Sequence, residues 1–249
     1  MIILINSSKT MRSKPGGAGR QRPALLDRAV ELDRALKVKS VAELKSLMHL
    51  SAKLAESTHE LIGRWNADPA AQTKAIDAFQ GDIFRGLKAD SLTEDEREYA
   101  NEVLRVLSGL YGILRPFDGI TPYRLELMYG LSGDGFANLY QFWGDAVAKT
   151  LPEDGLIVDA ASDEYARLVR PFVDPARIVE PQFLTVDRLV AEPTFVVVHA
   201  KVARGTFARW LITSRITDPA EFHAFADLDY TYDEATSTLD RPVFIKRFG

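Results

Sequence analysis

Polar side chains follow two apolar segments of this chain, at the points where each segment ends. The run Ser7-Ser8-Lys9-Thr10 follows the apolar residues 2–5, and the run Ser162-Asp163-Glu164 follows the apolar residues 156–158. Short apolar runs of this kind are typical of buried strands. Ligands of open α/β sheets commonly bind at the carboxyl ends of the strands. These residues therefore predict a binding site at one edge of a sheet.

A third apolar segment, residues 194–200, is predicted to be a central strand, and Lys201 and Arg204 follow it. If this strand lies parallel to those at 1–6 and 156–160, the polar residues after all three meet in one cleft. Lysine and arginine there suit an anion such as phosphate, and the carboxylates suit acid–base chemistry or a metal ion. Simple N-capping is the alternative role for residues 162–164. The reaction stays open, and the catalytic candidates are Asp163, Glu164, Lys9 and Lys201.

The segment 107–128 supplies a second group of polar residues on a stiff backbone. It contains three glycines and two prolines, so a helix cannot run through it. Gly109 stands where a helix that ends near Leu107 would need a left-handed residue. We expect Arg115 and Arg124, together with Tyr123, to form one wall of the same cleft. A long connector with buried aromatic residues is the alternative interpretation.

Composition limits the class of protein. The chain has 249 residues, of which 46% are hydrophobic, and it has no cysteine. That length and composition suffice for a substantial core, and disulfides and thiolate chemistry are excluded. The net charge of −4 argues against a uniformly basic nucleic-acid binder, yet the stretch from Lys9 to Arg22 has five basic residues and no acid. A basic arm on an acidic body favours anion binding, and a solvated loop is the alternative.

Several common sites are excluded by their motifs. The glycine-rich residues 15–20 are not followed by Gly-Lys-Ser/Thr and lie too far from the first strand for a dinucleotide loop. The four histidines lack metal-ligand spacing, and no Gly-X-Ser-X-Gly elbow is present. We therefore predict no metal and no cofactor. The apolar N-terminal run is too short for a signal peptide or a membrane span, so we expect a cytoplasmic protein without a membrane partner.

The pattern of elements predicts a single α+β domain over residues 1–249, with a mixed β-sheet and many helices. Capping boxes at Ser40 and Thr93 open helices, the second of which is expected to reach about Leu107. Further helices are predicted at 68–79 and 136–150. Residues 20–150 are thus helix-rich and 155–249 strand-rich. The strand at 1–6 must pair with later strands, because a lone strand cannot be buried.

Several long motifs in this order resemble the YaaA peroxide-stress family over nearly the whole chain. They are Ile-Asn-Ser-Ser-Lys-Thr at 5–10, Phe-Gln-Gly-Asp-Ile-Phe-Arg-Gly-Leu at 79–87, the segment 107–127, Leu-Tyr-Gln-Phe-Trp-Gly-Asp at 139–145, Ala-Ser-Asp-Glu-Tyr at 161–165 and Ala-Lys-Val-Ala-Arg-Gly at 200–205. Two features depart from the family pattern. Ser8 stands where the family usually has proline, and the basic, glycine-rich arm at 11–22 is not a family motif. Both departures are compatible with a specialised relative that has a different ligand.

The resemblance implies a cytoplasmic bacterial protein that limits oxidative damage under peroxide stress, is linked to lowering free iron, and binds DNA. It also implies a positively charged cleft and a helix-hairpin-helix-like element, for which residues 108–112 and the helix before them are the best match. Pro116 leaves the second helix barely one turn, which argues against a paired-helix clamp there. The predicted ligand or DNA-phosphate contacts are Ser7, Lys9, Thr10, Gly109, Gly112, Arg115, Tyr123, Arg124, Ser162, Lys201 and Arg204.

Two functions remain open at this stage. The first is sequence-independent binding of DNA through its phosphate backbone, which the resemblance places ahead. The second is an enzyme acting on a nucleotide-like or phosphorylated small molecule, which the paired acids beside lysines favour. A purely structural partner protein is disfavoured, because the motifs concentrate in polar loops.

Overall fold

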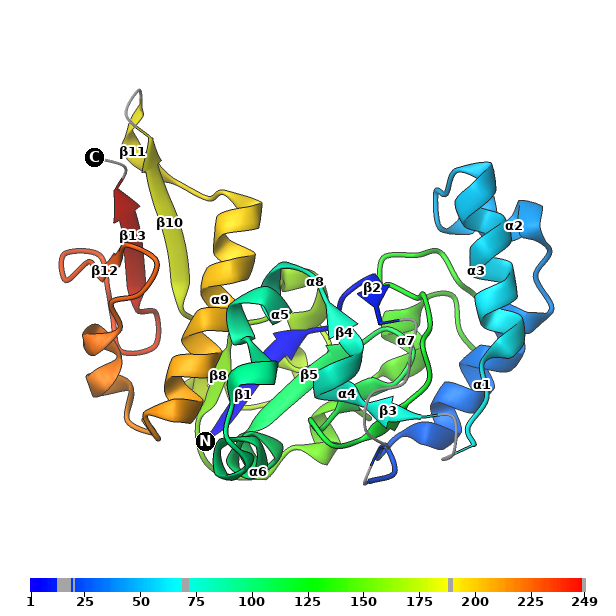
Figure 1. Ribbon diagram of the computed structural model, residues 1–249, viewed down its shortest axis with the longest axis horizontal. Coiled ribbons are helices and arrows are strands. Elements are labelled where there is room, and N and C mark those ends of the chain that lie inside the picture. Colours follow the sequence, from blue (N-terminus) through cyan, green and yellow to red (C-terminus); the bar gives the residue numbers. More distant parts are fainter. Residues whose placement is uncertain (13–18, 20, 69–71, 188–189, 248–249) are drawn as a thin grey trace.

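A mixed sheet of five strands forms the centre of the protein (Figure 1). The computed structural model describes residues 1–12, 19, 21–68, 72–187 and 190–247. Within these residues the strand order is β6-β5-β1-β8-β9. The bounds are β1 Ile2–Asn6, β5 Leu104–Ser108, β6 Gly112–Leu114, β8 Ile157–Asp159 and β9 Ile178–Val179. The predicted strands at 1–6 and 156–158 are confirmed, and so is the α+β class.

The directions of these strands define the edge at which the site forms. β1 runs parallel to both β5 and β8, with Leu4 opposite Arg105 on one side and Asp159 on the other. The carboxyl ends of the three strands therefore meet at one edge of the sheet, next to Ser7, Gly109 and Ala160. β6 alone runs antiparallel, beside β5, so its last residue, Leu114, lies toward the opposite edge.

A second sheet packs at the C-terminal end of the molecule and has the strand order β11-β10-β13-β12 (Figure 1). Its bounds are β10 Gln182–Asp187, β11 Val190–Thr194, β12 Tyr230–Tyr232 and β13 Val243–Arg247. The long helix α9, Val197–Thr213, lies between this sheet and α5, Asp82–Leu87. Phe183, Phe207 and Phe244 contact one another from the sheet and the helix. The predicted strand pair near the C-terminus is confirmed by β12 and β13.

Two glycines allow α5 and α9 to approach closely. A Cβ atom on Gly205 would overlap the carbonyl oxygen of Ile83, and one on Gly86 would overlap that of Val202. Only glycine fits at such a backbone contact. The contact fixes where Lys201, one turn before Gly205, lies relative to Asp82.

The prediction of a central strand at 194–200 is wrong, because residues from Val197 onward are helical. Val197 and Val198 are about half exposed, whereas Ala200, Ala203 and Phe207 are fully buried. The burial thus follows a helical period rather than the alternation of a strand. A run rich in valine is equally compatible with either element when read alone.

The helix predicted from Thr93 to about Leu107 is too long. α6 spans Glu94–Val103 and is followed at once by β5. The hairpin at 109–111 consequently joins two antiparallel strands, so this window is not a helix-hairpin-helix element. The helix predicted at 136–150 is also reduced, to α7 at Leu139–Trp143 and η3 at Ala148–Thr150.

The helix predicted at 68–79 is much shorter within the described residues. There β3 covers Thr73–Lys74, α4 covers Ala75–Ala78 and β4 covers Phe79–Gln80, while residues 69–71 lie outside the described residues. β3 pairs with β7, Gly119–Ile120, and β4 pairs with β2, Thr10–Met11. The remaining short elements are α8 Asp163–Ala166, η2 Ala89–Ser91, η4 Arg170–Phe172, η5 Pro175–Arg177 and η6 Pro219–Ala224.

Three helices form an arm at the end of the molecule opposite the second sheet (Figure 1). They are α1 Leu26–Lys37, α2 Val41–Leu47 and α3 Ala52–Arg64. The predicted capping boxes at Ser40 and Thr93 are both confirmed. The arm is tied to the body where the indole N–H of Trp65 donates to the Tyr111 hydroxyl over 3.0 Å.

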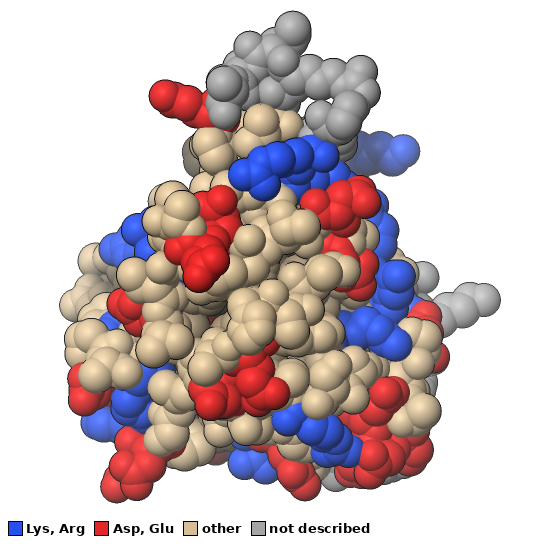
Figure 2. Space-filling view, turned by 90° about the vertical axis from the view of Figure 1, so that its left-hand side faces the viewer, with Lys and Arg blue, Asp and Glu red and all other residues tan. Residues whose placement is uncertain are grey.

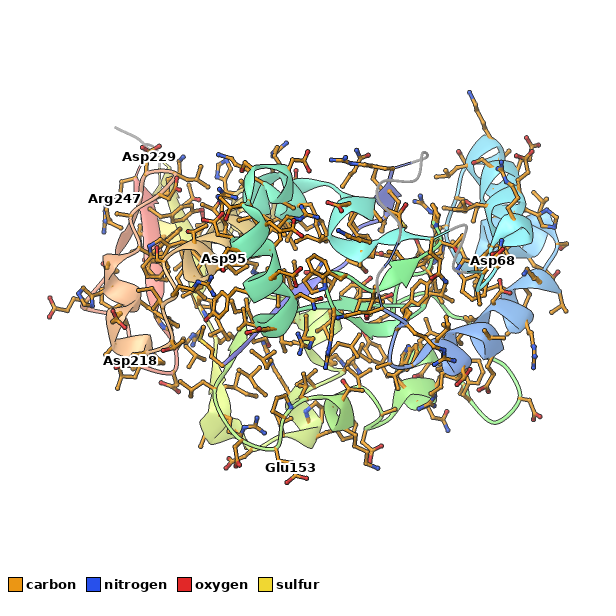
Figure 3. The ribbon with its side chains drawn as sticks, turned by 60° about the horizontal axis from the view of Figure 1, so that its bottom comes forward. Asp68, Asp95, Glu153, Asp218, Asp229 and Arg247 are labelled. Carbon is orange, nitrogen blue, oxygen red and sulfur yellow. The ribbon has the colours of Figure 1, made fainter. Side chains whose placement is uncertain are left out.

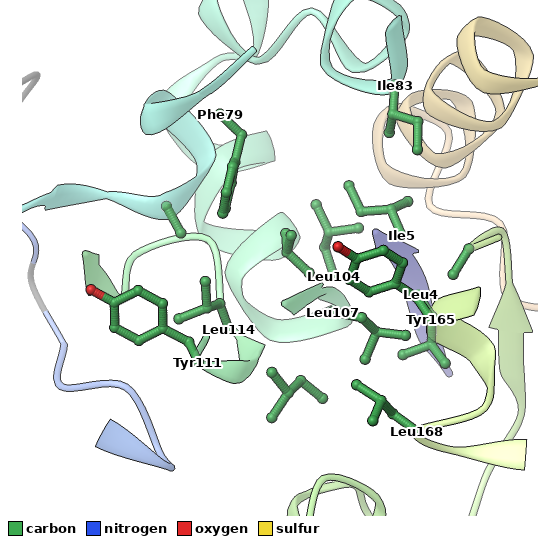
Figure 4. Packing of buried hydrophobic residues seen from close by; sticks show 14 of the residues in the cluster. Leu4, Ile5, Phe79, Ile83, Leu104, Leu107, Tyr111, Leu114, Tyr165 and Leu168 are labelled. Atoms are coloured by element: carbon green, nitrogen blue, oxygen red, sulfur yellow. The ribbon is translucent and has the colours of Figure 1, made fainter. Parts of the chain in front are cut away.

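The core is apolar, and most charged side chains lie outside it; the buried exceptions among the described residues are Asp33, Arg105, Asp118 and Asp159. Figure 4 shows Leu4 and Ile5 of β1 packed with Leu104 and Leu107 of β5 and with Tyr165 of α8. The side chains labelled in Figure 3 are all exposed; they are Asp68, Asp95, Glu153, Asp218, Asp229 and Arg247. None of the helices in the described part of the chain has the length and apolar character needed to cross a membrane.

Candidate functional site

A cavity of about 310 Å³ lies at the carboxyl end of β1. We call it the strand-end cavity. Three segments form most of its wall: the residues after β1, the start of α5, and the loop that carries Glu126. Its lining residues are Asn6, Ser7, Ser8, Lys9, Gly81, Asp82, Ile83, Phe84, Glu126, Glu164 and Lys201. A cavity of this size suits a small molecule.

Glu126 is held in the wall by two polar contacts. The hydroxyl of Tyr165 donates to Oε1 of Glu126 over 3.1 Å, and the ammonium of Lys9 lies 3.6 Å from Oε2. The Glu126 side chain is only 15% exposed. A carboxylate so far out of water needs such partners to remain charged. Its orientation is therefore fixed by residues from α8 and from the segment after β1.

Glu164 faces the same cavity from α8. Its Oε1 accepts a hydrogen bond of 3.1 Å from the backbone N–H of Met128. Burial raises the pKa of this carboxyl group, and the nearby charge of Glu126 raises it further, while Met128 and Lys9 oppose the shift. A carboxyl group with a raised pKa next to an ionised one is an arrangement used for acid–base chemistry.

The two lysines of the cavity, Lys9 and Lys201, differ in their contacts: Lys9 pairs with Glu126, whereas Lys201 has no such partner among the described residues. The side chain of Lys9 is 53% exposed, and its ammonium is 6.0 Å from the centre of the Tyr129 ring. Lys201 projects from α9, and it forms no ion pair with any described residue. The glycine contact between α5 and α9 fixes its backbone. Lys201 is thus a positioned cation that a ligand can neutralise.

A hydroxyl network lies beneath the cavity. The Ser7 hydroxyl is 3.4 Å from that of Tyr165, and Ser108 Oγ is 2.7 Å from the Tyr123 hydroxyl. Burial raises the pKa of both tyrosines, so they remain protonated. Both phenols therefore act as hydrogen-bond donors or acceptors and not as bases.

The structure brings together four of the predicted site residues at the cavity, namely Ser7, Lys9, Glu164 and Lys201. Tyr123 lies below them in the hydroxyl network. Thr10 continues into β2 and pairs with Gln80. Ser162 is the N-cap of α8, and its N–H donates to Asn6 Oδ1 over 3.1 Å.

Asp163 and Arg204 belong to a neighbouring charged cluster. The exposed Asp163 lies 3.2 Å from Arg170, which also pairs with the buried Asp159 at 2.6 Å and with Glu180 at 3.0 Å. Burial lowers the pKa of Arg204, and the carboxylates of Asp159 and Asp163 oppose that shift. Neither Asp163 nor Arg204 lines the strand-end cavity.

The predicted residues of the segment 107–128 are divided between different places. Gly109 lies against the backbone of Leu125, and Gly112, with φ +70°, lies against the ring of Trp143. Both glycines are buried by packing. Arg115 follows β6 and lines a second cavity together with Arg105 and Asp118. The Nε atom of Arg124 is buried, and no described residue hydrogen-bonds to it.

Several cavity residues were absent from the predicted set, above all Glu126, Asn6 and Asp82. The alternation of residue types at 123–127 is a signal for Glu126. Tyr123, Leu125 and Leu127 are buried, so the residues between them face the other side of the segment. Asp82 reaches the cavity only because β2 pairs with β4, which brings Gly81 against Ser8. No local pattern in the sequence indicates that pairing.

Among the described residues, no group of three or more His, Cys, Asp and Glu side chains is arranged to hold a metal ion. The chemistry that the cavity offers comes from its own groups. Lys9 and Lys201 can bind an anionic group, and Glu164 and Glu126 can exchange a proton with a bound molecule.

Comparisons with known proteins agree with the resemblance in the motifs. The sequence model of the family described as "Peroxide stress protein YaaA" matches residues 1–236. A protein of Salinispora tropica, named "UPF0246 protein", is 53% identical over 251 aligned positions, which cover 100% of this chain and 95% of that protein. The match thus extends over every segment that forms the strand-end cavity.

Proposed function

The chain belongs to the YaaA family of peroxide stress proteins, and on that basis we propose that it binds DNA through the phosphate backbone and so limits iron-driven damage. The observation that supports this proposal is the helical hairpin formed by α2 and α3. The two helices project from the body at one end of the molecule (Figure 1). A projecting hairpin can reach a duplex without rearrangement of the core.

Capping residues and apolar contacts within the hairpin stabilise its two helices. Ser40 and Ser51 cap the two helices, and Ser51 Oγ accepts from the backbone N–H of Leu54 over 3.4 Å. The turn between them contains His49 with φ +53°. Buried Leu44 and Ala55 hold the helices together. The first backbone N–H groups of α3 thus lie at an exposed turn, where they can donate hydrogen bonds to a phosphate group.

Cations at this turn are free to contact DNA. Lys45 and Lys53 are exposed and form no ion pair with a described residue. The one acid of α2, Glu43, is occupied by the capping box with Ser40. By contrast, the opposite end of the molecule mixes both charge signs (Figure 2), which does not favour a polyanion there.

A substitution pair tests this proposal. The variant with Lys45→Gln and Lys53→Gln should bind a DNA duplex more weakly, in a fluorescence anisotropy titration at low salt. The control carries Lys149→Gln and Arg241→Gln, which remove two exposed cations elsewhere. Equal affinities for the two variants would contradict a role of the hairpin.

A second function is favoured by the strand-end cavity. There Glu164 and Glu126 face Lys9 and Lys201 within about 310 Å³, which is too small for a duplex but suits a nucleotide-like or phosphorylated small molecule. Under this alternative the lysines bind the phosphoryl group and Glu164 transfers a proton. The test is a thermal-shift screen of nucleotides and sugar phosphates. A ligand that stabilises the wild type but not Lys201→Gln supports it, and a screen without a stabilising ligand contradicts it.

A further inference from the structure

A second cavity, of about 410 Å³, lies toward the opposite edge of the central sheet, beyond the end of β6. Its polar lining includes Gln21, Arg22, Arg105, Arg115 and Asp118. We call it the arginine cavity. It shares no lining residue with the strand-end cavity.

The key residue of the arginine cavity is Arg105, which is only 7% exposed. Its Nη1 donates to the carbonyl oxygens of Leu104 and Asn101, over 2.8 and 3.3 Å. No carboxylate of the described residues lies within 4.0 Å of its guanidinium. A buried cation without a counterion is costly unless an anion pairs with it.

A second positive charge nearby makes the absence of an anion more costly still. Val106 and Leu114 form the terminal residue pair between β5 and β6, and Arg115 is the residue that follows Leu114. Continuing that register sets Arg115 opposite Arg105. Like charges directly opposite on two strands repel each other. Burial, together with the charge of Arg115, lowers the pKa of Arg105 to about 10, while the charge of Asp118 opposes the shift.

Two acceptor groups also point to the nature of the ligand. The Oε1 atom of Gln21 is buried and has no hydrogen-bond partner among the described residues. The backbone of Gln21 is fixed by hydrogen bonds to Phe117 and Gly119, of 3.2 and 2.8 Å. Asp118 is 3% exposed, and its Oδ2 accepts from the backbone N–H of Arg115 over 2.8 Å. A ligand here must therefore combine an anionic group with a hydrogen-bond donor.

We propose that the arginine cavity binds a small phosphomonoester that carries a hydroxyl group. The phosphoryl group lies between Arg105 and Arg115, because its three terminal oxygens can accept from both guanidinium groups at once. The hydroxyl group donates to Gln21 Oε1 or to Asp118. Ala24, Ile113 and Leu114 supply apolar contacts for the carbon skeleton. This site is independent of the proposed DNA contacts and of the strand-end cavity.

Isothermal titration with glycerol 3-phosphate tests the site. We expect one molecule to bind the wild type. Arg115→Gln, at an exposed position, should weaken binding about tenfold or more, as the loss of a charged hydrogen bond implies. Arg34→Gln, which removes an exposed arginine of α1, should leave the affinity unchanged. The site is overturned if the wild type does not bind, if Arg115→Gln binds equally well, or if Lys201→Gln and not Arg115→Gln abolishes binding.

A further comparison does not depend on a folded Arg105 variant. The wild type should bind glycerol 3-phosphate more tightly than methyl phosphate, and Gln21→Leu should reduce this preference. Equal binding of the two esters by the wild type would overturn the role of the hydroxyl group.

Discussion

The hydroxyl of Tyr165 donates to Oε1 of Glu126 over 3.1 Å, across 39 residues of sequence. This bond joins α8, which follows β8, to the loop that follows β7. Ser7 at the end of β1 lies 3.4 Å from the same hydroxyl. One phenol thus connects three segments that wall the strand-end cavity, and it orients a carboxylate that has little access to water.

The first prediction concerns this phenol. Tyr165→Phe keeps the ring and removes the donor to Glu126, which leaves a poorly hydrated carboxylate with one fewer partner. We expect the free energy of unfolding, measured by urea denaturation, to fall by about 1.5–3 kcal/mol. Tyr99→Phe is the control, because the Tyr99 hydroxyl forms no hydrogen bond with a described residue. A loss no larger than that of the control would mean that Glu126 is held by Lys9 alone.

The second prediction concerns the contact between α5 and α9. Gly205→Ala inserts a methyl group against the backbone of Ile83, and we expect a loss of stability of about 1–3 kcal/mol. The same substitution at Gly63 in α3 meets no atom within 4 Å. It should stabilise the protein by about 0.5–1 kcal/mol, because alanine favours helix. Thermal unfolding of the two variants shows whether their effects have opposite signs; a neutral Gly205→Ala would contradict the close packing.

The third prediction follows from Asp118, whose pKa burial raises from 3.8 to about 6, against the opposing effect of the Arg115 backbone N–H. Between these two pH values the folded protein binds more protons than the unfolded chain. Its free energy of unfolding therefore falls as pH rises through this window, by about 3 kcal/mol in total.

Asp118→Asn removes this titration and retains an acceptor for the Arg115 N–H. Relative to the wild type, the variant should gain stability between about pH 4 and pH 6 and then remain constant. Asp134→Asn, at an exposed carboxyl group, is the control. Urea denaturation across this range measures the difference. A gap between wild type and Asp118→Asn that does not change with pH would show that Asp118 titrates normally.

The fourth prediction concerns the anchor of the helical arm. Tyr111 accepts from the indole of Trp65 and from the backbone N–H of Thr121, each over 3.0 Å. Tyr111→Phe leaves both donors buried without a partner. We expect faster hydrogen exchange in α3 and weaker DNA binding, although no charge is removed. Unchanged exchange in α3 would show that apolar packing alone holds the arm.

Much of the local structure could be predicted from the sequence. The capping boxes at Ser40 and Thr93 depend on residues three apart, and both form as expected. The strand at Ile2–Asn6 and the turn into α8 also follow from short patterns. In each case the decisive interactions lie within a few residues of one another.

Where the decisive interactions are distant in sequence, prediction was less successful. The strand Leu104–Ser108 continues an apolar helical pattern without a break, and its identity depends on pairing with β1 and β6. The prediction of a strand at 194–200 is wrong because valine-rich runs suit strands and buried helices alike. Glu126 and Asp82 line the strand-end cavity through contacts between segments that are distant in sequence. Arg115, by contrast, lies toward the opposite edge of the sheet, because it follows β6 and β6 runs antiparallel to β5.

The central claim, that this protein binds DNA through cations of the α2–α3 hairpin, is tested most directly by the salt dependence of its affinity for a duplex. The logarithm of the binding constant should fall linearly with the logarithm of salt concentration, and the slope should be smaller by about two in the variant with Lys45→Gln and Lys53→Gln. The slope should be unchanged in Lys201→Gln. An affinity that does not depend on salt, or an equal slope in the hairpin variant and the wild type, would contradict the account.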